Sequence, residues 1–314
     1  SVVRDRIAQL VPSVVIGPTG MSMAGSGGMT VARFLGAKPS TIRNPGALAR
    51  SMRRVPHAPG FTVIIDEAPM VATVEIIALD RGLKLARRSS KPFGGVRVVI
   101  FGDFCQLAAP AATTPLFLTA PYKALKPDTV VLKQQMRQTD DPVFAALLDD
   151  CRRGQLSTAS ANVLLYTLNA KTPPDGVLRL YATRKEAARW NQKMLKRLPA
   201  PQVNGLRVGA RVVVTRNIYV GSALALVNGD VGDLTALTAR SATISVRGRS
   251  RTLPMPAPLG LAYALTIHKS QGQTYDAVTL VGTNIFAAGQ VYTALSRARS
   301  LAGVYCVDVM PEHA

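Results

Sequence analysis

The fold of this chain is decided by the stretch Ala262-Tyr263-Ala264-Leu265-Thr266-Ile267-His268-Lys269-Ser270-Gln271-Gly272-Gln273-Thr274 and by the shorter stretch Tyr292-Thr293-Ala294-Leu295-Ser296-Arg297-Ala298-Arg299. The first stretch places polar and basic residues directly after a short apolar run, and the second ends in two arginines. Few folds require both patterns. The strand-helix alternation that resumes at Leu261 predicts that both stretches belong to one α/β domain.

Three short apolar runs in the first 150 residues predict strands of a parallel sheet. Val14-Val15-Ile16 leads into a glycine-rich loop, Phe61 to Ile65 ends in Asp66-Glu67, and Val96 to Phe101 ends in Gly102-Asp103. Runs of about five residues that are rich in β-branched side chains are typical of strands buried on both faces. Functional sites of open α/β sheets lie at the carboxyl ends of such strands.

The remaining pattern predicts further α/β structure with one β-rich insertion. We expect helices over residues 2–10, 141–167 and 185–195, and a strand over residues 178–181. Residues 208–258 are instead rich in valine, threonine, glycine and arginine, with alternating runs such as Ala242 to Val246. This composition predicts a small β-barrel inserted into the second α/β domain.

The charge of the chain indicates a polyanionic partner. The net charge is +20, from 38 basic and 18 acidic residues, and such an excess favours binding to nucleic acid. The basic residues recur in three patches: Arg81, Lys84, Arg87, Arg88, Lys91 and Arg97; Arg184, Lys185, Arg189, Lys193, Lys196 and Arg197; and Arg240, Arg247, Arg249 and Arg251. A single patch of this kind is as often a solvated surface as a binding site. The basic charge summed over the whole chain is what favours nucleic acid.

Cysteine usage and hydropathy exclude several classes of protein. The three cysteines are widely spaced and no Cys-x-x-Cys occurs, which argues against a disulfide scaffold and a structural zinc site. We therefore expect a reducing, intracellular location, without a distinction between cytoplasm, nucleus and mitochondrion. No uninterrupted apolar run of about 18 residues occurs, so no membrane span and no membrane partner are expected.

Two polar strand ends are candidates for chemistry. Asp66-Glu67 suits a site where an aspartate holds Mg²⁺ through its shell and a glutamate accepts a proton from water. Gln106, within Gly102 to Leu107, could sense a γ-phosphate. Each signal is weak alone, because the first could be a solvated strand end and the second a β-turn with buried Phe104 and Leu107.

The chain contains no Gly-x-x-x-x-Gly-Lys-[Ser/Thr] phosphate loop. The glycine-rich segment from Gly17 to Thr30 has no lysine, and lysine is the residue that supplies the charge on the β- and γ-phosphates. We therefore reject this segment as a phosphate loop.

Taken together, the ordered segments resemble the Pif-type (petite-integration-frequency) DNA helicases of superfamily 1B, which are 5′-to-3′ motors. The resemblance covers nearly the whole chain and six motifs in order: Pro18 to Gly36 resembles motif Ia, Ile64 to Met70 motif II, Gly102 to Leu107 motif III, Leu132 to Gln138 motif IV, Thr266 to Thr274 motif V and Gln290 to Arg299 motif VI. Gly209 to Val212 and Leu226 to Gly229 resemble the approach to the SH3-like barrel that this family inserts.

The resemblance implies two RecA-like domains and the site residues of the family. The domains would be 1A over 1-127, with a short 1B insertion near 37-60, 2A over 128-207 and 259-314, and the inserted 2B over 208-258. The implied catalytic residues are Asp66, Glu67, Gln106, Arg137 and Arg297, with the last two as arginine fingers. The implied ATP-binding residues are Ser1, Asp66 and Gly272, and the implied Mg²⁺ ligands are Asp66 and Ser1. The implied nucleic-acid contacts are Pro18, Thr19, Gly20, Asn228, His268, Lys269 and Ser270.

The chain departs from the family pattern in three places. Pro69 stands where the family usually has serine, and Leu107-Ala108-Ala109-Pro110 stands where the family has Leu-Pro-Pro after motif III; neither should abolish chemistry. The phosphate loop, with the strand before it, is the larger absence. We expect that the chain begins immediately after a Gly-Lys pair, with Ser1 as the remnant of the loop, although Ser1 could also be an ordinary helix N-cap.

The sequence therefore predicts an ATP-dependent 5′-to-3′ DNA helicase or translocase that uses ATP and Mg²⁺, here in an N-terminally truncated form with weak or no turnover. The alternative is a motor-derived protein that binds single-stranded nucleic acid without hydrolysing ATP. The expected partners are single-stranded DNA and duplex junctions, with RNA left open, and a monomer is expected. Replication, repair and recombination would all fit.

Overall fold

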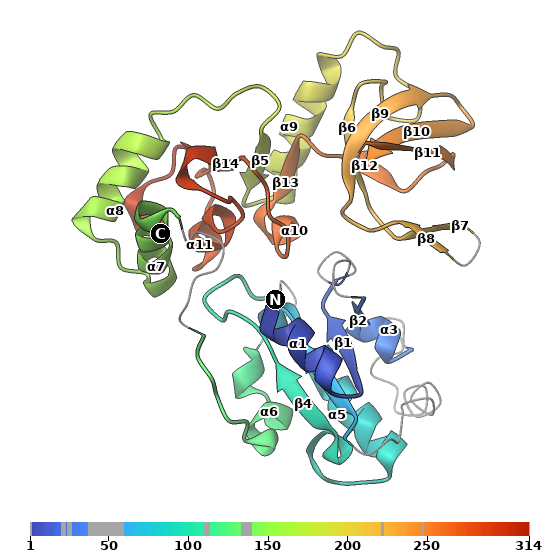
Figure 1. Ribbon diagram of the computed structural model, residues 1–314. Coiled ribbons are helices and arrows are strands. Elements are labelled where there is room, and N and C mark those ends of the chain that lie inside the picture. The colour runs from blue at the N-terminus through green and yellow to red at the C-terminus, as the bar shows by residue number, and fades with distance from the viewer. Residues whose placement is uncertain are drawn as a thin grey trace. The chain divides into compact units, whose positions relative to one another are not determined.

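The computed structural model describes residues 2–19, 23, 27–36, 60–109, 114–132, 140–220, 223–246 and 248–313. The chain divides into two compact units, Ser1–Lys133 and Gln134–Ala314. Each unit contains a parallel sheet of its own, and unit 2 also contains an antiparallel sheet (Figure 1).

Unit 1 is built on a four-stranded parallel sheet with the order β2-β1-β3-β4. Its strands are β1 (Ser13–Gly17), β2 (Met29–Thr30), β3 (Thr62–Ile65) and β4 (Arg97–Ile100). Its helices are α1 (Val2–Leu10), α3 (Val31–Phe34), α5 (Thr73–Arg87) and α6 (Ala120–Leu125), with short 3₁₀ turns η2 (Ala68–Met70), η3 (Pro92–Gly95) and η4 (Leu116–Leu118). The strands expected at residues 14–16 and 61–65 and the helix at 2–10 are confirmed.

The unit 1 sheet has an apolar layer on each face. On one face, α1 packs Ile7 and Ala8 against a cluster that contains Val15 and Ile64. On the other face, α5 and its neighbours pack against Ile16, Val63 and Ile65 in a larger cluster. Alternate residues of β1 and β3 thus point to opposite layers, as a strand's period of two requires. Burial on both faces explains why these runs are continuously apolar.

Strand β4 departs from the expected burial on both faces. Arg97 is exposed, and Val98, Val99 and Ile100 are half-buried. The reason is the strand's place at one end of the sheet order, with β3 as its single neighbour among the described strands. The apolar run correctly indicated a strand, but it did not indicate an edge position.

Unit 2 is built on a second parallel sheet, with the order β13-β5-β14-β15. Its strands are β5 (Leu178–Tyr181), β13 (Ala264–Thr266), β14 (Val278–Val281) and β15 (Val304–Val307). Its helices are α7 (Pro142–Arg153), α8 (Thr158–Asn162), α9 (Arg184–Lys196), α10 (Ile267–Ser270) and α11 (Gln290–Leu295), with the π-helical turn η5 (Val163–Leu168) and the 3₁₀ turns η6 (Leu301–Gly303) and η7 (Pro311–His313). The strand at 178–181 and the helix at 185–195 are confirmed.

The helical prediction for residues 141–167 is confirmed for most of the range by α7, α8 and η5, but the helix breaks at Gly154. That glycine ends α7 in the left-handed region, at φ 68°, where its N–H caps the preceding turn. Glycine tolerates this conformation without steric cost, so the position favours a helix end. A new helix, α8, begins after Ser157, whose side chain accepts from the Ser160 N–H.

The β-rich segment forms a five-stranded sheet with the order β11-β10-β9-β6-β12, and its paired strands are antiparallel. The strands are β6 (Arg211–Val214), β9 (Val231–Leu237), β10 (Ser241–Val246), β11 (Arg249–Pro254) and β12 (Leu259–Leu261), and a separate hairpin joins β7 (Ile218–Val220) to β8 (Ala223–Leu226). Along β10 buried and half-buried residues alternate, as the sequence predicted. Among the described helices of both units, none has the length and apolar character needed to cross a membrane.

Candidate functional site

The carboxyl edge of the unit 1 sheet brings the motif II segment beside the end of β1. Ile16 pairs with Ile65, so Gly17 and Asp66 follow two neighbouring strands at the same edge. The Asp66 N–H donates to the Ile16 carbonyl oxygen over 2.8 Å. A Cβ atom on Gly17 would lie 3.2 Å from the Asp66 carbonyl oxygen and 2.5 Å from the Met23 methyl carbon. The absence of a side chain at Gly17 therefore allows the two strand ends to approach closely.

Asp66 is held by an arginine of α1. The Arg4 Nη1 atom donates to the Asp66 carboxylate, and the Nε and Nη2 atoms donate to Asp5 Oδ1 over 2.8 and 2.6 Å. The Arg4 and Asp66 side chains are 9% and 14% exposed. Burial alone would lower the pKa of Arg4, but hydrogen bonds and charges from Asp5 and Asp66 raise it. The Asp66 carboxylate is thus compensated by a fixed positive charge.

Glu67 follows in an unusual backbone conformation. Its φ of 49° and ψ of 43° lie in the left-handed region, which non-glycine residues adopt rarely. Residues held in this conformation cluster at functional sites. The turn η2 begins after it, with buried Ala68 and Pro69. Pro69 occupies a first-turn position where no N–H is needed, which explains why proline is accepted there.

The motif III segment is attached to this turn through the backbone. Phe101 accepts from the Ala68 N–H over 2.9 Å, and Pro69 accepts from the Ala109 N–H over 3.1 Å. A Cβ atom on Gly102 would lie 2.4 Å from Pro69 Cδ. Gln106 is half-buried, and its N–H donates to the Asp103 carbonyl oxygen over 3.1 Å. The predicted motifs II and III thus form one connected edge.

Part of the β-turn alternative for motif III is also correct. Leu107 is buried at 4% exposure, whereas Phe104 is 43% exposed and contacts Phe117 edge to face with ring centroids 5.4 Å apart. Phe104 is therefore not the buried residue that the alternative required.

In unit 2, the motif V segment forms the end of β13 and the short helix α10. The Thr266 side chain caps this helix by accepting from the Lys269 N–H. His268 and Lys269 are half-buried. Burial, and then the nearby charge of Arg184, lower the pKa of Lys269. Two cations at the carboxyl ends of β13 and β5 make this edge of unit 2 electropositive.

Ser270 does not present its side chain to a ligand in this structure. It is fully buried, and its hydroxyl donates to the Ile267 carbonyl oxygen over 2.7 Å. Its side chain therefore stabilises the turn of α10, and the nucleic-acid contact assigned to Ser270 stays a prediction. Gly272 follows in the left-handed region at φ 78°, and it is half-buried.

Arg297 joins the motif V and motif VI segments. Its Nε donates to the Thr293 carbonyl oxygen over 2.9 Å, its Nη1 to the Gln273 carbonyl oxygen over 3.2 Å and its Nη2 to Ser296 Oγ over 2.8 Å. The Tyr275 N–H donates back to the Arg297 carbonyl oxygen over 2.8 Å. Arg297 is 1% exposed. In this structure the Arg297 guanidinium is therefore not exposed as an arginine finger would be, because it is buried and hydrogen-bonded.

The other predicted site residues fall in three places. Pro18 and Thr19 are half-buried after β1. Asn228 lies in the turn between β8 and β9, where its N–H donates to Asn217 Oδ1 over 2.8 Å. Ser1, Gly20 and Arg137 lie outside the described residues, as do the centre of motif IV and most of the 37-60 insertion.

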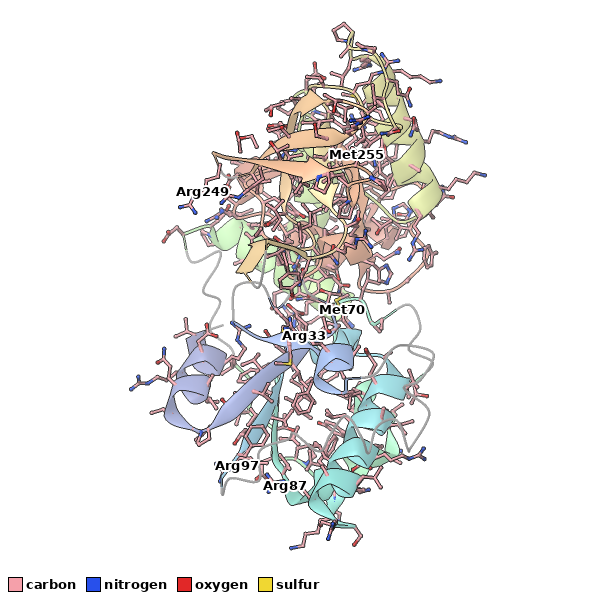
Figure 2. All side chains as sticks on the ribbon, turned by 90° about the vertical axis from the view of Figure 1, so that its right-hand side faces the viewer. Arg33, Met70, Arg87, Arg97, Arg249 and Met255 are labelled. Carbon is pink, nitrogen blue, oxygen red and sulfur yellow. The ribbon has the colours of Figure 1, made fainter. Side chains whose placement is uncertain are left out.

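One basic patch lies away from the site edge. Arg87 ends α5 and Arg97 begins β4, so both lie at the amino edge of the unit 1 sheet. Figure 2 shows Arg33 and Met70 toward one end of unit 1 and Arg87 and Arg97 toward the other. The first of the three basic patches is therefore at the opposite end of unit 1 from Asp66.

Sequence reasoning missed Arg4 and Arg184. The sequence predicted a helix over residues 2–10. A helical pattern does not indicate that Arg4 contacts a carboxylate 62 positions further along the chain. The available signal was topological: a helix that leads directly into β1 begins at the carboxyl edge of the sheet. Arg184 was assigned to a basic patch, and its position at the first turn of α9, close to Lys269, became evident from the fold.

The residues of unit 1 fit a metal ion that arrives with a nucleotide better than a resident one. Among the described residues, no group of three or more His, Cys, Asp or Glu side chains could hold a metal. Protein sites for Mg²⁺ commonly use one or two carboxylates, with water and substrate phosphates as the other ligands. Asp66, with Glu67 beside it, fits that pattern.

Comparisons with known proteins agree with the motif order. Residues 48–160 match the family described as PIF1-like helicase, and residues 261–305 match the UvrD-like helicase C-terminal domain. The chain is 29% identical over 359 residues to the ATP-dependent DNA helicase PIF1 of Rattus norvegicus, an alignment that covers 95% of this chain and 55% of the rat protein. The chain thus spans about half the length of that relative. The Bdellovibrio bacteriovorus ATP-dependent DNA helicase Pif1 is 27% identical, over 95% of this chain and 78% of its own length.

Solved structures show the same fold. The Pif1 helicase of Candida albicans superposes with a TM-score of 0.79 at 26% identity, covering 99% of this chain and 89% of its own. The Bacteroides Pif1 in complex with ADP-AlF3 and ssDNA superposes with a TM-score of 0.76 at 24% identity, over 96% and 83% of the two chains. The two parallel sheets therefore fit the RecA-like helicase fold, and the resemblance inferred from the motifs is confirmed. The chain is therefore similar to the PIF1-like helicases over most of its length.

Proposed function

We propose that this chain is the motor portion of an ATP-dependent 5′-to-3′ DNA helicase or translocase. The observation that carries the proposal is the connected edge of unit 1, where Asp66, Glu67 and Gln106 follow two adjacent strands. Backbone hydrogen bonds from Ala68 to Phe101 and from Ala109 to Pro69 join the two segments. Relatives named ATP-dependent DNA helicases support the activity, and the Bacteroides complex with ADP-AlF3 supports use of a nucleotide.

In this proposal the unit 1 edge holds the nucleotide. Mg²⁺ bound with ATP would neutralise phosphate charge. Asp66 would hold the Mg²⁺ ion through its water shell, and Glu67 would orient the attacking water and take its proton. Gln106 detects the γ-phosphate from the same edge. The roles of Ser1 and Gly272 in nucleotide binding and of Ser1 as a second metal ligand belong to the same proposal.

Two arginines would stabilise the charge that develops during phosphoryl transfer. We assign these roles to Arg137 and Arg297, and an arginine in this position is worth about 10³–10⁵ in rate. The buried geometry of Arg297 implies that it must exchange at least one of its acceptors before it can contact a phosphate. Its attachment to both motif V and motif VI would then pass that change to the strand-binding segment.

The proposed strand contacts use phosphate charge more than base identity. Pro18, Thr19 and Gly20 in unit 1 and Asn228, His268 and Lys269 in unit 2 are the contacts we assign. Contacts of this kind are salt-dependent and nearly blind to sequence. Single-stranded DNA and duplex junctions are the proposed partners, and the solved Pif1 structures with ssDNA and with forked dsDNA support that choice. We also propose a monomer.

We also propose the family's domain organisation for this chain. Domain 1A would span 1-127, 2A would span 128-207 and 259-314, and 2B would span 208-258 as an SH3-like barrel. The antiparallel sheet of β6, β9, β10, β11 and β12 supports the last assignment. Its apolar core gathers around Val212, Leu234 and Ile244.

The test is ATP hydrolysis with and without single-stranded DNA. Because the sequence has no phosphate loop, the assay compares the chain with a form extended before Ser1 by a strand and a loop that ends in Gly-Lys. We expect DNA-stimulated turnover in the extended form and its collapse in Arg297→Ala. The matched control is Arg299→Ala, because Arg299 lies two positions away in an exposed ion pair with Asp276.

The outcomes separate two classes of function. Turnover stimulated by DNA and lost in Arg297→Ala supports the motor. Salt-sensitive DNA binding without turnover in either form would instead identify a nucleic-acid-binding protein derived from a motor. Equal loss of turnover in Arg297→Ala and Arg299→Ala would contradict the role assigned to Arg297.

A further inference from the structure

Arg4 is a buried arginine whose role the family motifs do not explain. It is 7% exposed, although it belongs to the first helix of the chain, where its neighbours Val3 and Arg6 are exposed. Burying an arginine is costly unless its charge is paired. The charge is paired here by two carboxylates, one from the next residue and one from the motif II segment.

The topology places this guanidinium at the carboxyl edge of the unit 1 sheet. Helix α1 packs on the sheet through Ile7 and Ala8, and two residues join it to β1. It therefore runs opposite to β1, and its first turns lie at the carboxyl edge of the sheet (Figure 1). Arg4 is in those first turns, and Asp66 follows β3 at the same edge.

Asp5 fixes the orientation of the guanidinium. Two of the three nitrogens of Arg4 donate to one oxygen of Asp5, which directs the remaining Nη1 toward Asp66. A planar guanidinium held at two nitrogens has little freedom to turn away. An arginine also stays charged at any pH at which the protein is folded. The charge beside Asp66 is thus permanent as long as α1 stays in place.

We infer that Arg4 is a positioning residue that competes with divalent cations for the Asp66 carboxylate. A cation that approaches Asp66 meets a carboxylate oxygen already engaged by Arg4 and a like charge beside it. Binding of the metal therefore requires that Arg4 release Asp66. Until the metal binds, the ion pair with Arg4 fixes the orientation of the Asp66 carboxylate and balances its charge. The positive charge of Arg4 therefore disfavours a cation that arrives without negatively charged phosphates.

The inference rests on the proposed function in one respect, that Asp66 faces the metal. The inference is tested by a separate measurement, because binding of a cation alone needs neither ATP nor DNA. Mn²⁺ is the probe, since it replaces Mg²⁺ at carboxylate sites and its free fraction can be read directly by electron paramagnetic resonance.

The experiment titrates the chain, at one protein concentration and low ionic strength, with Mn²⁺. The variants are Arg4→Met, Arg6→Met as the exposed control on the same helix, and Arg4→Met combined with Asp66→Asn. We expect Arg4→Met to bind Mn²⁺ about tenfold more tightly than the wild-type chain, which corresponds to about 1.4 kcal/mol. Arg6→Met should bind as the wild type does, and Asp66→Asn should remove the gain.

Arg4→Lys covers the case in which Arg4→Met does not fold. Lysine keeps the charge but lacks the planar fork that contacts Asp5 and Asp66 together. We expect a smaller gain in Mn²⁺ affinity than the one given for methionine. Circular dichroism melts show which variants are folded before each titration.

Three results would overturn the inference. They are unchanged Mn²⁺ affinity in a folded Arg4 variant, weaker affinity in that variant, or a gain that persists when Asp66 is replaced. Changes in thermal stability alone, without a change in Mn²⁺ affinity, would mean that Arg4 only attaches α1 to the sheet. Loss of DNA-stimulated turnover in the assay of the proposed function would leave the Mn²⁺ result standing, and the reverse also holds.

Discussion

The guanidinium of Arg297 donates to the carbonyl oxygen of Gln273 over 3.2 Å, and this bond joins the segment after α10 to the segment after α11. The same side chain also donates to Thr293 and Ser296 while remaining 1% exposed. The arginine assigned to catalysis is therefore also a structural residue of unit 2. Its substitution must affect both stability and turnover.

Replacing Arg297 should destabilise unit 2. In Arg297→Met the Gln273 carbonyl oxygen and the Ser296 hydroxyl lose the donors that Arg297 supplies, whereas the Thr293 carbonyl oxygen keeps the Ser296 hydroxyl as a donor. Leaving a buried polar group unsatisfied costs about 1–3 kcal/mol. We expect a loss of this size in the free energy of unfolding, measured by urea denaturation. Arg299→Met should cost no more than about 1 kcal/mol, because the Arg299 and Asp276 side chains are 69% and 93% exposed. Equal losses in the two variants would contradict the structural role of the Arg297 hydrogen bonds.

Stability in acid should depend on Asp150. Hydrogen bonds from Ser157 and Ser160 lower the pKa of this carboxyl from 3.8 to about 2. A depressed pKa in the folded state contributes stability that is present above the unfolded-state pKa and is lost as pH falls toward the folded-state value. We therefore expect the contribution to disappear as pH falls from about 4 to about 2.

The measurement is urea denaturation across that pH window. Asp150→Asn should show a weaker loss of stability on acidification than the wild type. Asp149→Asn, on the same helix, leaves the Ser157 and Ser160 contacts to Asp150 intact, so the wild-type acid dependence should remain. An Asp150→Asn variant that loses stability as steeply as the wild type would refute this prediction.

Lys269 should contribute one phosphate contact to DNA binding. Replacing a single such lysine is expected to reduce the slope of log K against log salt by about one. Because burial and the charge of Arg184 lower the pKa of Lys269, binding by the wild type should weaken as pH rises sooner than an ordinary lysine would predict. Lys269→Ala should lose that part of the pH dependence.

Fluorescence anisotropy with a labelled oligonucleotide measures both effects. Lys196→Ala is the charge-matched control, because Lys196 is exposed at the end of α9. If the two variants lower affinity and salt slope equally, Lys269 acts through net charge and not through a positioned contact.

Gly102 should be required for turnover because it allows motif III to approach motif II. A Cβ atom at this position would lie 2.4 Å from Pro69 Cδ and 3.2 Å from the Ala68 backbone nitrogen. The rigid proline ring cannot turn aside, so the turn after Glu67 must move. A displacement near 1 Å can cost about 10²-fold in rate.

We expect Gly102→Ala to lose about that factor in turnover of the extended form while it stays folded. Gly260→Ala is the control, because the nearest atom to its Cβ would be a Thr215 methyl carbon at 3.4 Å, an ordinary contact. Unchanged turnover in Gly102→Ala would show that the position of the turn does not matter for catalysis.

Local sequence patterns correctly predicted the strands that are buried on both faces. The runs at residues 14–16 and 61–65 are β1 and β3, because burial on both faces requires continuous apolar residues. The edge position of β4 could not be read from an equally apolar run, since it depends on pairing with strands elsewhere in the chain. The helix break at Gly154 was present in the sequence as a glycine after two arginines, a pattern typical of a helix end.

The site was predicted in its motifs but not in its contacts. Motif order predicted the roles of Asp66, Glu67 and Arg297, which stay predictions, and the structure brings motif II to motif III and motif V to motif VI. The pairing of Arg4 with Asp66 and the burial of Arg297 and Ser270 depend on tertiary packing. No spacing along one helix or strand carries that information.

The most direct test of the central claim is the unwinding of a short DNA duplex by the extended form with ATP, compared between a 5′ and a 3′ single-stranded tail. A 5′-to-3′ motor is predicted to separate the 5′-tailed duplex in an ATP-dependent reaction and to leave the 3′-tailed duplex largely paired. Preference for the 3′ tail, or equal strand separation without ATP, would contradict the account.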